Sequence, residues 1–154
     1  MRRLSTPLCL CAFVAVAALG AGCGEGGAAN GATVHVYVAA PLCGESQRKL
    51  KQEGGVEDLR VRLVCLPQVE SGGRVDLAQA GANARRATED STAVAYLEAP
   101  GPGAKFSHPI LESADIAWLE TSSGSTAMRR VLSALKEAGS SSPRDAVRES
   151  LSGQ

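Results

Sequence analysis

Residues 76–98, DLAQAGANARRATEDSTAVAYLE, decide the fold class of this chain. Within 76–90, small apolar residues recur at spacings of three and four, which predicts a helix whose narrow apolar stripe can lie close to a sheet. Asp76 can cap this helix, with Gln79 three residues later as in a loose capping box. Ala93–Leu97 (AVAYL) has the composition of a buried strand. A helix followed closely by such a strand is typical of α/β domains.

Further strands are expected on both sides of this pair. They are Thr33–Ala39 (TVHVYVA), Leu59–Leu66 (LRVRLVCL) and Ile116–Leu119 (IAWL). The second one changes from alternating to continuously apolar, as in a strand that enters a covered sheet. Strands that alternate with helices predict an α/β fold, an open parallel sheet of about four strands with helices on both faces.

Local signals set the expected helix boundaries. Pro41 is expected to stop the first strand, and Pro109 to interrupt a short helix. Ser125 is the expected cap of a later helix, and Gly139 its C-terminal stop. Ser142 precedes a proline and an acidic residue, which predicts the start of a last helix. Besides 76–90, the helices are expected at 44–53, 104–113, 126–138 and from 143 onward.

A small-molecule site, if the chain has one, is expected at one edge of the sheet. In open α/β sheets the ligand crevice lies beyond the carboxyl ends of the strands. Here those ends lead into the segments 41–44, 66–67, 99–103 and 121–124.

The N-terminus reads as a secretion signal. Arg2 and Arg3 give it a positive start, and Leu8–Leu19 form a short apolar stretch that ends in small residues before Cys23. A cysteine at this point resembles the lipobox of bacterial lipoproteins, although Gly20 stands where these boxes prefer Leu. The alternatives are an ordinary signal peptide or an uncleaved anchor with an incidental cysteine.

The lipoprotein resemblance implies a processed and anchored protein. Residues 1–22 would be removed as the signal peptide, and Cys23 would be acylated, with palmitate for example. The Gly/Ala-rich segment 23–32 would then tether the domain to the extracytoplasmic face of the cell membrane.

Composition excludes several classes of function. The chain has 16 basic and 16 acidic side chains and no basic stripe, so a nucleic-acid partner is not expected.

Cys9 and Cys11 fall within the signal, which leaves Cys43 and Cys65 for the folded part. Outside the cytoplasm these two could form a disulfide, or they could remain separate thiols.

The order VHVYVAAPLCG, VRLVCLP and ANARRATEDSTAVAYLE resembles the first lobe of type I periplasmic binding proteins, in particular the branched-chain amino acid-binding proteins of ABC transporters. The match covers roughly 33–124. The segment 125–154 is similar to a helix near the far C-terminus of that family. Family members have two lobes, so this chain is expected to be a single lobe in which the C-terminal helices pack on the first-lobe domain.

The resemblance also places a binding site. The family reads Gly-x-x-x-Ser after the third strand and Ser-Pro-x-x-Thr after the fourth, and those groups hold the ligand's carboxylate. Here Glu98 replaces the Gly, Pro102 the Ser, and Gly124 the Thr. The remaining candidates to bind an amino-acid-like carboxylate are Gly103, Ser122, Ser123 and Ser125.

Two functions follow from these features. The first is a lipid-anchored solute-binding module that docks on an ABC permease. The second is an accessory or structural lipoprotein, or a remnant of a binding protein, which binds no solute and acts through protein partners. A homodimer, in which a second copy supplies the missing lobe, is a third arrangement, but no residue in the sequence indicates it.

An enzyme is not expected. His35 falls within a strand pattern and His108 precedes a proline in a surface helix. The chain has no metal-ligand spacing, no P-loop and no dinucleotide motif, so no cofactor is expected. Glu112, Asp115 and Glu120 straddle a strand, which implies no carboxylate pair.

Overall fold

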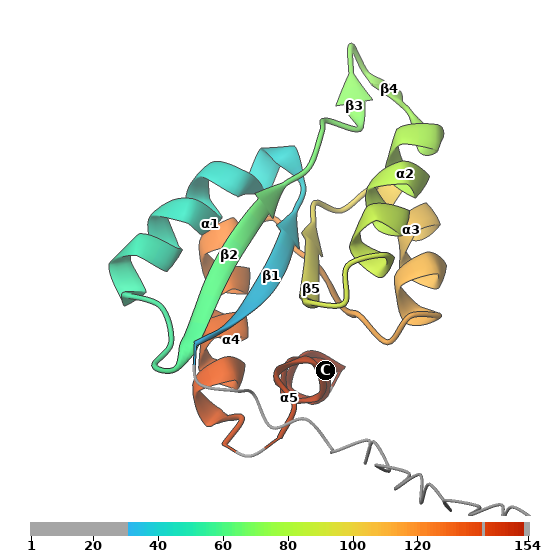
Figure 1. The fold of residues 1–154 in the computed structure, drawn as a ribbon. Coiled ribbons are helices and arrows are strands. Elements are labelled where there is room, and N and C mark those ends of the chain that lie inside the picture. Colours follow the sequence, from blue (N-terminus) through green and yellow to red (C-terminus); the bar gives the residue numbers. More distant parts are fainter. Residues whose placement is uncertain (1–30, 140, 153–154) are drawn as a thin grey trace, which may run out of the picture.

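Four parallel strands form the central sheet of the computed structural model, which describes residues 31–139 and 141–152 (Figure 1). The spatial order is β2-β1-β5-β6. The strands are β1 (Ala32–Val38), β2 (Leu59–Cys65), β5 (Ala93–Glu98) and β6 (Ala117–Glu120). The predicted α/β class is therefore confirmed.

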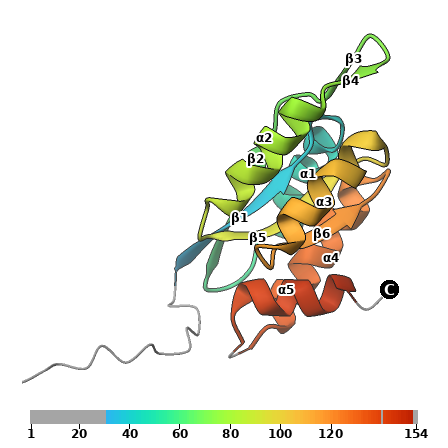
Figure 2. The same cartoon turned by 90° about the vertical axis from the view of Figure 1, so that its right-hand side faces the viewer.

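Helices cover both faces of the sheet (Figures 1 and 2). The first layer consists of α1 (Ala40–Glu53), α4 (Gly124–Glu137) and α5 (Pro143–Ser152). The second layer consists of α2 (Leu77–Thr88) and α3 (Pro102–Glu112), which pack on each other. Two separate hydrophobic cores result, one under each layer.

Alternation along β1 distributes its side chains between these cores. Val34, Val36 and Val38 pack under α1, α4 and α5. Tyr37 points to the opposite face and packs with Tyr96 of β5 under α2 and α3. Successive side chains of a strand point to opposite faces, so a strand buried on both sides reads as a nearly continuous apolar run.

β2 behaves differently because it is an edge strand. Arg60, Arg62 and Cys65 are exposed, and the apolar residues between them are only half-buried. Val61 and Leu63 nevertheless pack against the first core, and Val64 against the second. The continuously apolar end of β2 therefore lies in a covered sheet, as expected.

Two helices start earlier than expected, each with a proline in the first turn. Pro41 lies at the start of α1 and Pro102 at the start of α3, where a missing N–H removes no helical bond. Pro109 lies inside α3 without interrupting it. A proline has no N–H, so Pro109 leaves the carbonyl of Lys105, four residues earlier, without its helical partner. Both residues are exposed, so this bond is lost on the solvent side of the helix.

The cap of α4 also differs from the expectation. Ser123, not Ser125, caps the helix, since its hydroxyl accepts a hydrogen bond from the Thr126 N–H over 3.3 Å. The helix begins at Gly124, two residues earlier than the sequence indicated. The cap predicted at Asp76 is confirmed, because its carboxylate accepts from the Gln79 N–H over 3.0 Å.

A short hairpin projects beyond the carboxyl ends of the strands (Figure 1). It pairs β3 (Glu70–Ser71) with β4 (Arg74–Val75) in antiparallel fashion. Gly72 and Gly73 both have positive φ, 59° and 74°, which favours glycine at the two central positions of such a turn.

Candidate functional site

A crevice lies at the carboxyl edge of the sheet, where the topology predicts a ligand site. Its volume is about 70 Å³. The residues that follow β1, β2 and β5 line it, together with the hairpin and the first turn of α3: 39–41, 67–70, 75 and 98–104. A cavity needs on the order of 10–15 Å³ to hold one water, so this one accepts a group of a few non-hydrogen atoms.

Glu98 is the buried carboxyl of this crevice. It is the last residue of β5 and is only 5% exposed. Its Oε1 accepts hydrogen bonds from the Ser107 hydroxyl of α3 and from the Trp118 indole N–H of β6, the latter over 2.7 Å. Burial, and then the nearby charge of Glu120, raise the pKa of Glu98 against the lowering effect of these bonds.

The surroundings of Trp118 extend this cluster toward the sheet edge. His108, an exposed residue of α3, stacks on the Trp118 indole with ring centroids 4.2 Å apart. Glu120 accepts a hydrogen bond from the Gly101 N–H over 3.2 Å, which fixes the loop after β5. Trp118 is half-buried in the edge strand β6. Its indole binds Glu98, and the residue also lines a second hollow of about 530 Å³ along β6.

The four residues expected to hold a ligand carboxylate do not converge. Gly103 lines the crevice from the first turn of α3, whereas Ser122 is exposed and is not among the residues that line this crevice. Ser123 is the cap of α4, and its hydroxyl lies 3.1 Å from that of Ser125. Ser125 lines a separate surface hollow beside Glu45, Arg48, Lys49 and Gln52 of α1.

Gly103 has little room for a side chain. A side chain at this position would lie 3.3 Å from Val69 Cγ1 and 3.9 Å from the Ala80 methyl carbon. Gly103 and Ser125 thus line different hollows, and the interpretation of Gly103, Ser122, Ser123 and Ser125 as one carboxylate-binding mouth stays a prediction. Only the location of the crevice, beyond the carboxyl ends of the strands, agrees with the topology argument.

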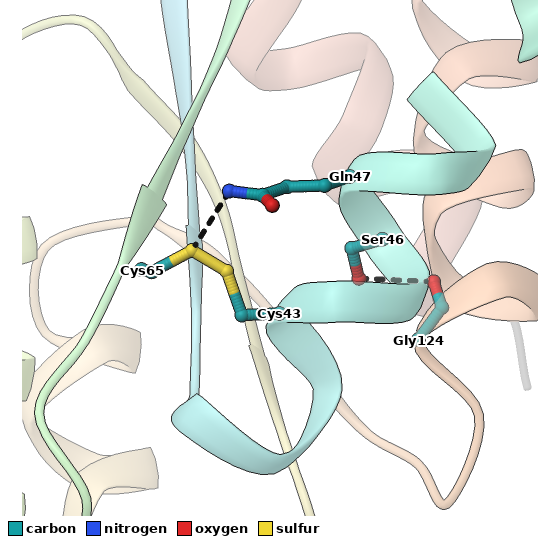
Figure 3. Close-up of a disulfide and its surroundings, with 5 residues drawn as sticks. All are labelled: Cys43, Ser46, Gln47, Cys65 and Gly124. Atoms are coloured by element: carbon teal, nitrogen blue, oxygen red, sulfur yellow. Dashed lines mark hydrogen bonds between the residues drawn. A yellow bond between two sulfur atoms is a disulfide. The ribbon is translucent and has the colours of Figure 1, made fainter. Parts of the chain in front are cut away.

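A disulfide joins Cys43 in the first turns of α1 to Cys65 at the end of β2 (Figure 3). The two Cα atoms are 5.7 Å apart, within the usual range for such a bond. The sequence left open whether these cysteines form a disulfide or remain separate thiols, and in the structure they form the disulfide. The bond ties the strand end that leads into the crevice wall at Pro67 to the helix that begins beside Pro41.

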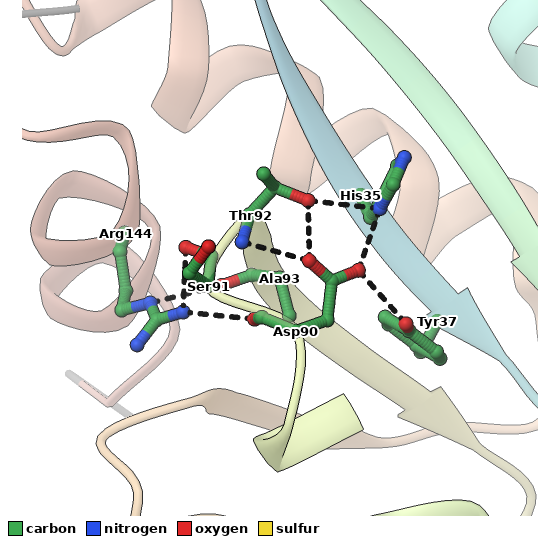
Figure 4. Close-up of polar contacts among 7 residues, drawn as sticks. All are labelled: His35, Tyr37, Asp90, Ser91, Thr92, Ala93 and Arg144. Atoms are coloured by element: carbon green, nitrogen blue, oxygen red, sulfur yellow. Dashed lines mark hydrogen bonds and ion pairs between the residues drawn. The ribbon is translucent and has the colours of Figure 1, made fainter. Parts of the chain in front are cut away.

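A second polar cluster lies at the opposite, amino edge of β5 (Figure 4). Asp90 Oδ2 lies 2.6 Å from His35 Nδ1 and accepts from the Tyr37 hydroxyl over 2.8 Å. Its Oδ1 accepts from both the hydroxyl and the N–H of Thr92. Burial alone would raise the pKa of Asp90, but the bonds from Thr92, His35 and Tyr37 hold it well below its usual range.

Arg144 of α5 completes this amino-edge cluster. Its guanidinium donates to the backbone carbonyls of Asp90, Ser91 and Ala93 over 3.3, 3.1 and 2.9 Å. Burial, followed by the hydrogen bond to Asp90, raises the pKa of Tyr37 to about 12. The sequence had indicated only that His35 is a core or face residue, and no motif pointed to this cluster. The one available signal was that His35 and Tyr37 alternate onto the same face of β1.

The described residues offer no group of metal ligands. Within residues 31–139 and 141–152, no three His, Cys, Asp or Glu side chains are grouped so that they could hold a metal ion. Among the helices of this part of the chain, none has the length and apolar character that a membrane span requires. Cys23 lies outside the described residues.

The fold and the crevice thus define a single open α/β sheet with a small, acidic pocket at its carboxyl edge. No protein-family model, no curated protein and no solved structure matches this chain.

Proposed function

We propose that this protein is a lipid-anchored, extracytoplasmic module that binds one end of a small solute in the crevice at the carboxyl edge of its sheet. The observation that carries this proposal is Glu98, a buried carboxyl that lines a crevice at the place where open α/β sheets bind their ligands. A perturbed carboxyl in a cleft is a recognised indication of a functional site.

The disulfide supports an extracytoplasmic location. Bonds of this kind persist in oxidising compartments and are rare where thiols are kept reduced. Cys43 and Cys65 are joined in the structure, and the signal-like sequence that ends at Cys23 indicates export to such a compartment. The two features are independent, since one lies in the folded lobe and the other precedes it.

The size of the crevice limits what the module binds alone. Small-molecule pockets usually have volumes of roughly 300–1,000 Å³ and bury most of the ligand. At about 70 Å³, this crevice takes only the end group of a solute. We therefore expect weak binding, with a Kd of about 1 mM, in keeping with the expectation that one lobe of a two-lobed fold leaves its ligand half open.

A second candidate function is that of an accessory lipoprotein that acts through protein partners, such as an ABC permease. The observation in its favour is the dispersal of Ser122, Ser123 and Ser125 away from the crevice. In that case the carboxyl edge is a docking surface or a remnant of a site, and no small solute stabilises the fold.

Thermal unfolding with amino acids at 10 mM separates the two functions. A ligand that binds only the folded state raises the Tm, and one with a Kd near 1 mM at this concentration is expected to raise it by a few degrees. A panel in which no amino acid moves the Tm would exclude solute binding by the isolated chain and leave the accessory function.

Lipid anchoring has its own test. Cells that express the protein are fed an alkyne-labelled fatty acid, and the label on the protein is compared with that on Cys23→Ser. We expect the wild type to be labelled and to sediment with membranes, and the variant to carry no label. Equal labelling of the two would reject Cys23 as the acylation site.

A further inference from the structure

We propose that the crevice takes the ammonium end of its ligand, with Glu98 as the counter-ion, and not the carboxylate end. This inference rests on the proposed solute-binding function and specifies the chemistry of that site. It reverses the expectation from the sequence, which assigned a carboxylate to the same edge.

Glu98 has only neutral hydrogen-bond partners within the described chain. Ser107 and Trp118 donate to it, and no Lys, Arg or His forms an ion pair with it. Glu120 of β6 opposes the ionisation of Glu98, and His108 of α3, which stacks on Trp118, favours it. A buried carboxyl that no cation contacts directly is costly to ionise, so a positive charge that pairs with it would stabilise its ionised form.

The free oxygen of Glu98 can be reached from outside. Both hydrogen bonds end on Oε1, and no described residue donates to Oε2. Every fully buried side-chain oxygen or nitrogen of the described residues has a hydrogen-bond partner. Since Oε2 has none, it is not fully buried and is in contact with solvent. Because Glu98 also lines the crevice, an incoming N–H group has an open acceptor there.

The charged side chains that line the crevice are all acidic, and prolines make up part of its wall. Its lining includes four prolines, Pro41, Pro67, Pro100 and Pro102, which have carbonyl oxygens but no N–H. The only charged side chains in the lining are Glu70 and Glu98, both acidic. A ligand carboxylate would be repelled by these carboxyls, whereas an ammonium group brings three donors and a compensating charge.

Three probes of matched shape test this chemistry on the full-length protein in detergent. Leucine carries both charged groups, leucinamide keeps only the ammonium, and 4-methylpentanoate keeps only the carboxylate. We expect leucinamide and leucine at 10 mM to raise the Tm by about 2–6 °C and 4-methylpentanoate to leave it unchanged. The leucinamide shift should grow as the pH rises through the pKa of Glu98, because the carboxylate is the form that pairs with the ammonium.

Glu98→Gln supplies the residue-specific arm. Gln keeps an acceptor for Ser107 and Trp118 but has no charge, and we expect it to reduce the affinity for leucinamide at least tenfold. Glu112→Gln, which removes an exposed carboxyl outside the crevice, is the matched control and should bind as the wild type does. A cooperative melt of each variant shows that it folds.

The outcomes separate this inference from the proposed function. A shift with 4-methylpentanoate and none with leucinamide would overturn the ammonium assignment while solute binding stands. Equal leucinamide binding by wild type and Glu98→Gln would overturn the role of Glu98. If none of the three probes raises the Tm of the wild type, both proposals are overturned, whatever the variants do.

Discussion

The hydroxyl of Ser46 in α1 donates a hydrogen bond to the backbone carbonyl of Gly124, 78 residues later at the start of α4, over 3.1 Å (Figure 3). Both residues are buried. The bond joins two helices that pack on each other, and it is feasible only because residue 124 has no side chain. A Cβ there would lie 2.7 Å from Ser46 Oγ and would also overlap the Leu42 carbonyl.

Gly124→Ala is expected to destabilise the protein by about 1–3 kcal/mol, since the added methyl group meets backbone as well as side-chain atoms. Chemical denaturation gives the free energy of unfolding. Gly44→Ala is the matched control in α1, because its methyl group would meet nothing closer than Arg48 Nη1 at 3.7 Å. That variant should be neutral or more stable by up to about 1 kcal/mol. Equal losses in both variants would contradict the packing argument.

Reduction of the Cys43–Cys65 disulfide is expected to destabilise the fold by roughly 3 kcal/mol, because the bond closes a loop across a sequence separation of 22 residues. Thermal melts with and without a phosphine reductant measure the effect. The Cys43→Ala/Cys65→Ala double variant should melt as the reduced protein does and should not respond to the reductant. A wild type whose Tm is insensitive to reductant would show that the bond does not stabilise the lobe.

Asp90→Asn is expected to cost about 2 kcal/mol at neutral pH, because it removes the charged acceptor shared by His35, Tyr37 and Thr92. The pKa of Asp90 is lowered in the folded state, so its stabilisation is present above the unfolded value of about 3.9 and is lost as the pH falls through the folded value. The variant and the wild type should therefore converge in acid. Glu89→Gln, at the exposed neighbouring position, should show no such trend.

Glu98→Gln is expected to be more stable than the wild type at alkaline pH, by a few degrees in Tm. The pKa of Glu98 is raised in the folded state, so the protonated carboxyl stabilises the fold at low pH, and this contribution is lost as the pH rises through the raised value. The difference in Tm should widen with pH and vanish in acid. A constant difference from pH 4 to pH 9 would mean that Glu98 does not titrate differently in the folded and unfolded states.

Much of the fold could be predicted from local patterns. β1 and β5 are buried on both faces, so their composition alone reveals them. The caps at Asp76 and Ser142 lie next to the backbone groups that they bind, and the sequence contains both partners. The starts of α1, α3 and α4 were placed too late because their first turns are held by tertiary contacts, such as that of Gly124 with α1.

The site was harder to predict than the fold. Topology places a crevice at the carboxyl edge, but it does not say which side chains turn into it. The amino-edge cluster brings His35 and Asp90 together across 55 residues, next to a register shift between β1 and β5 that follows His35. No local pattern encodes an irregularity of pairing between two distant strands, so this cluster was visible only in the structure.

The place of β1 in the sheet has a consequence for biogenesis. β1 is the first strand of the described residues and lies inside the sheet, between β2 and β5, so its pairing is complete only when residues 93–98 are available. A chain exported N-terminus first would present this valine-rich strand to the outside well before its second neighbour arrives. Late long-range pairing makes folding slow and leaves apolar edges open to aggregation, so we expect such a chain to need a holding chaperone during export.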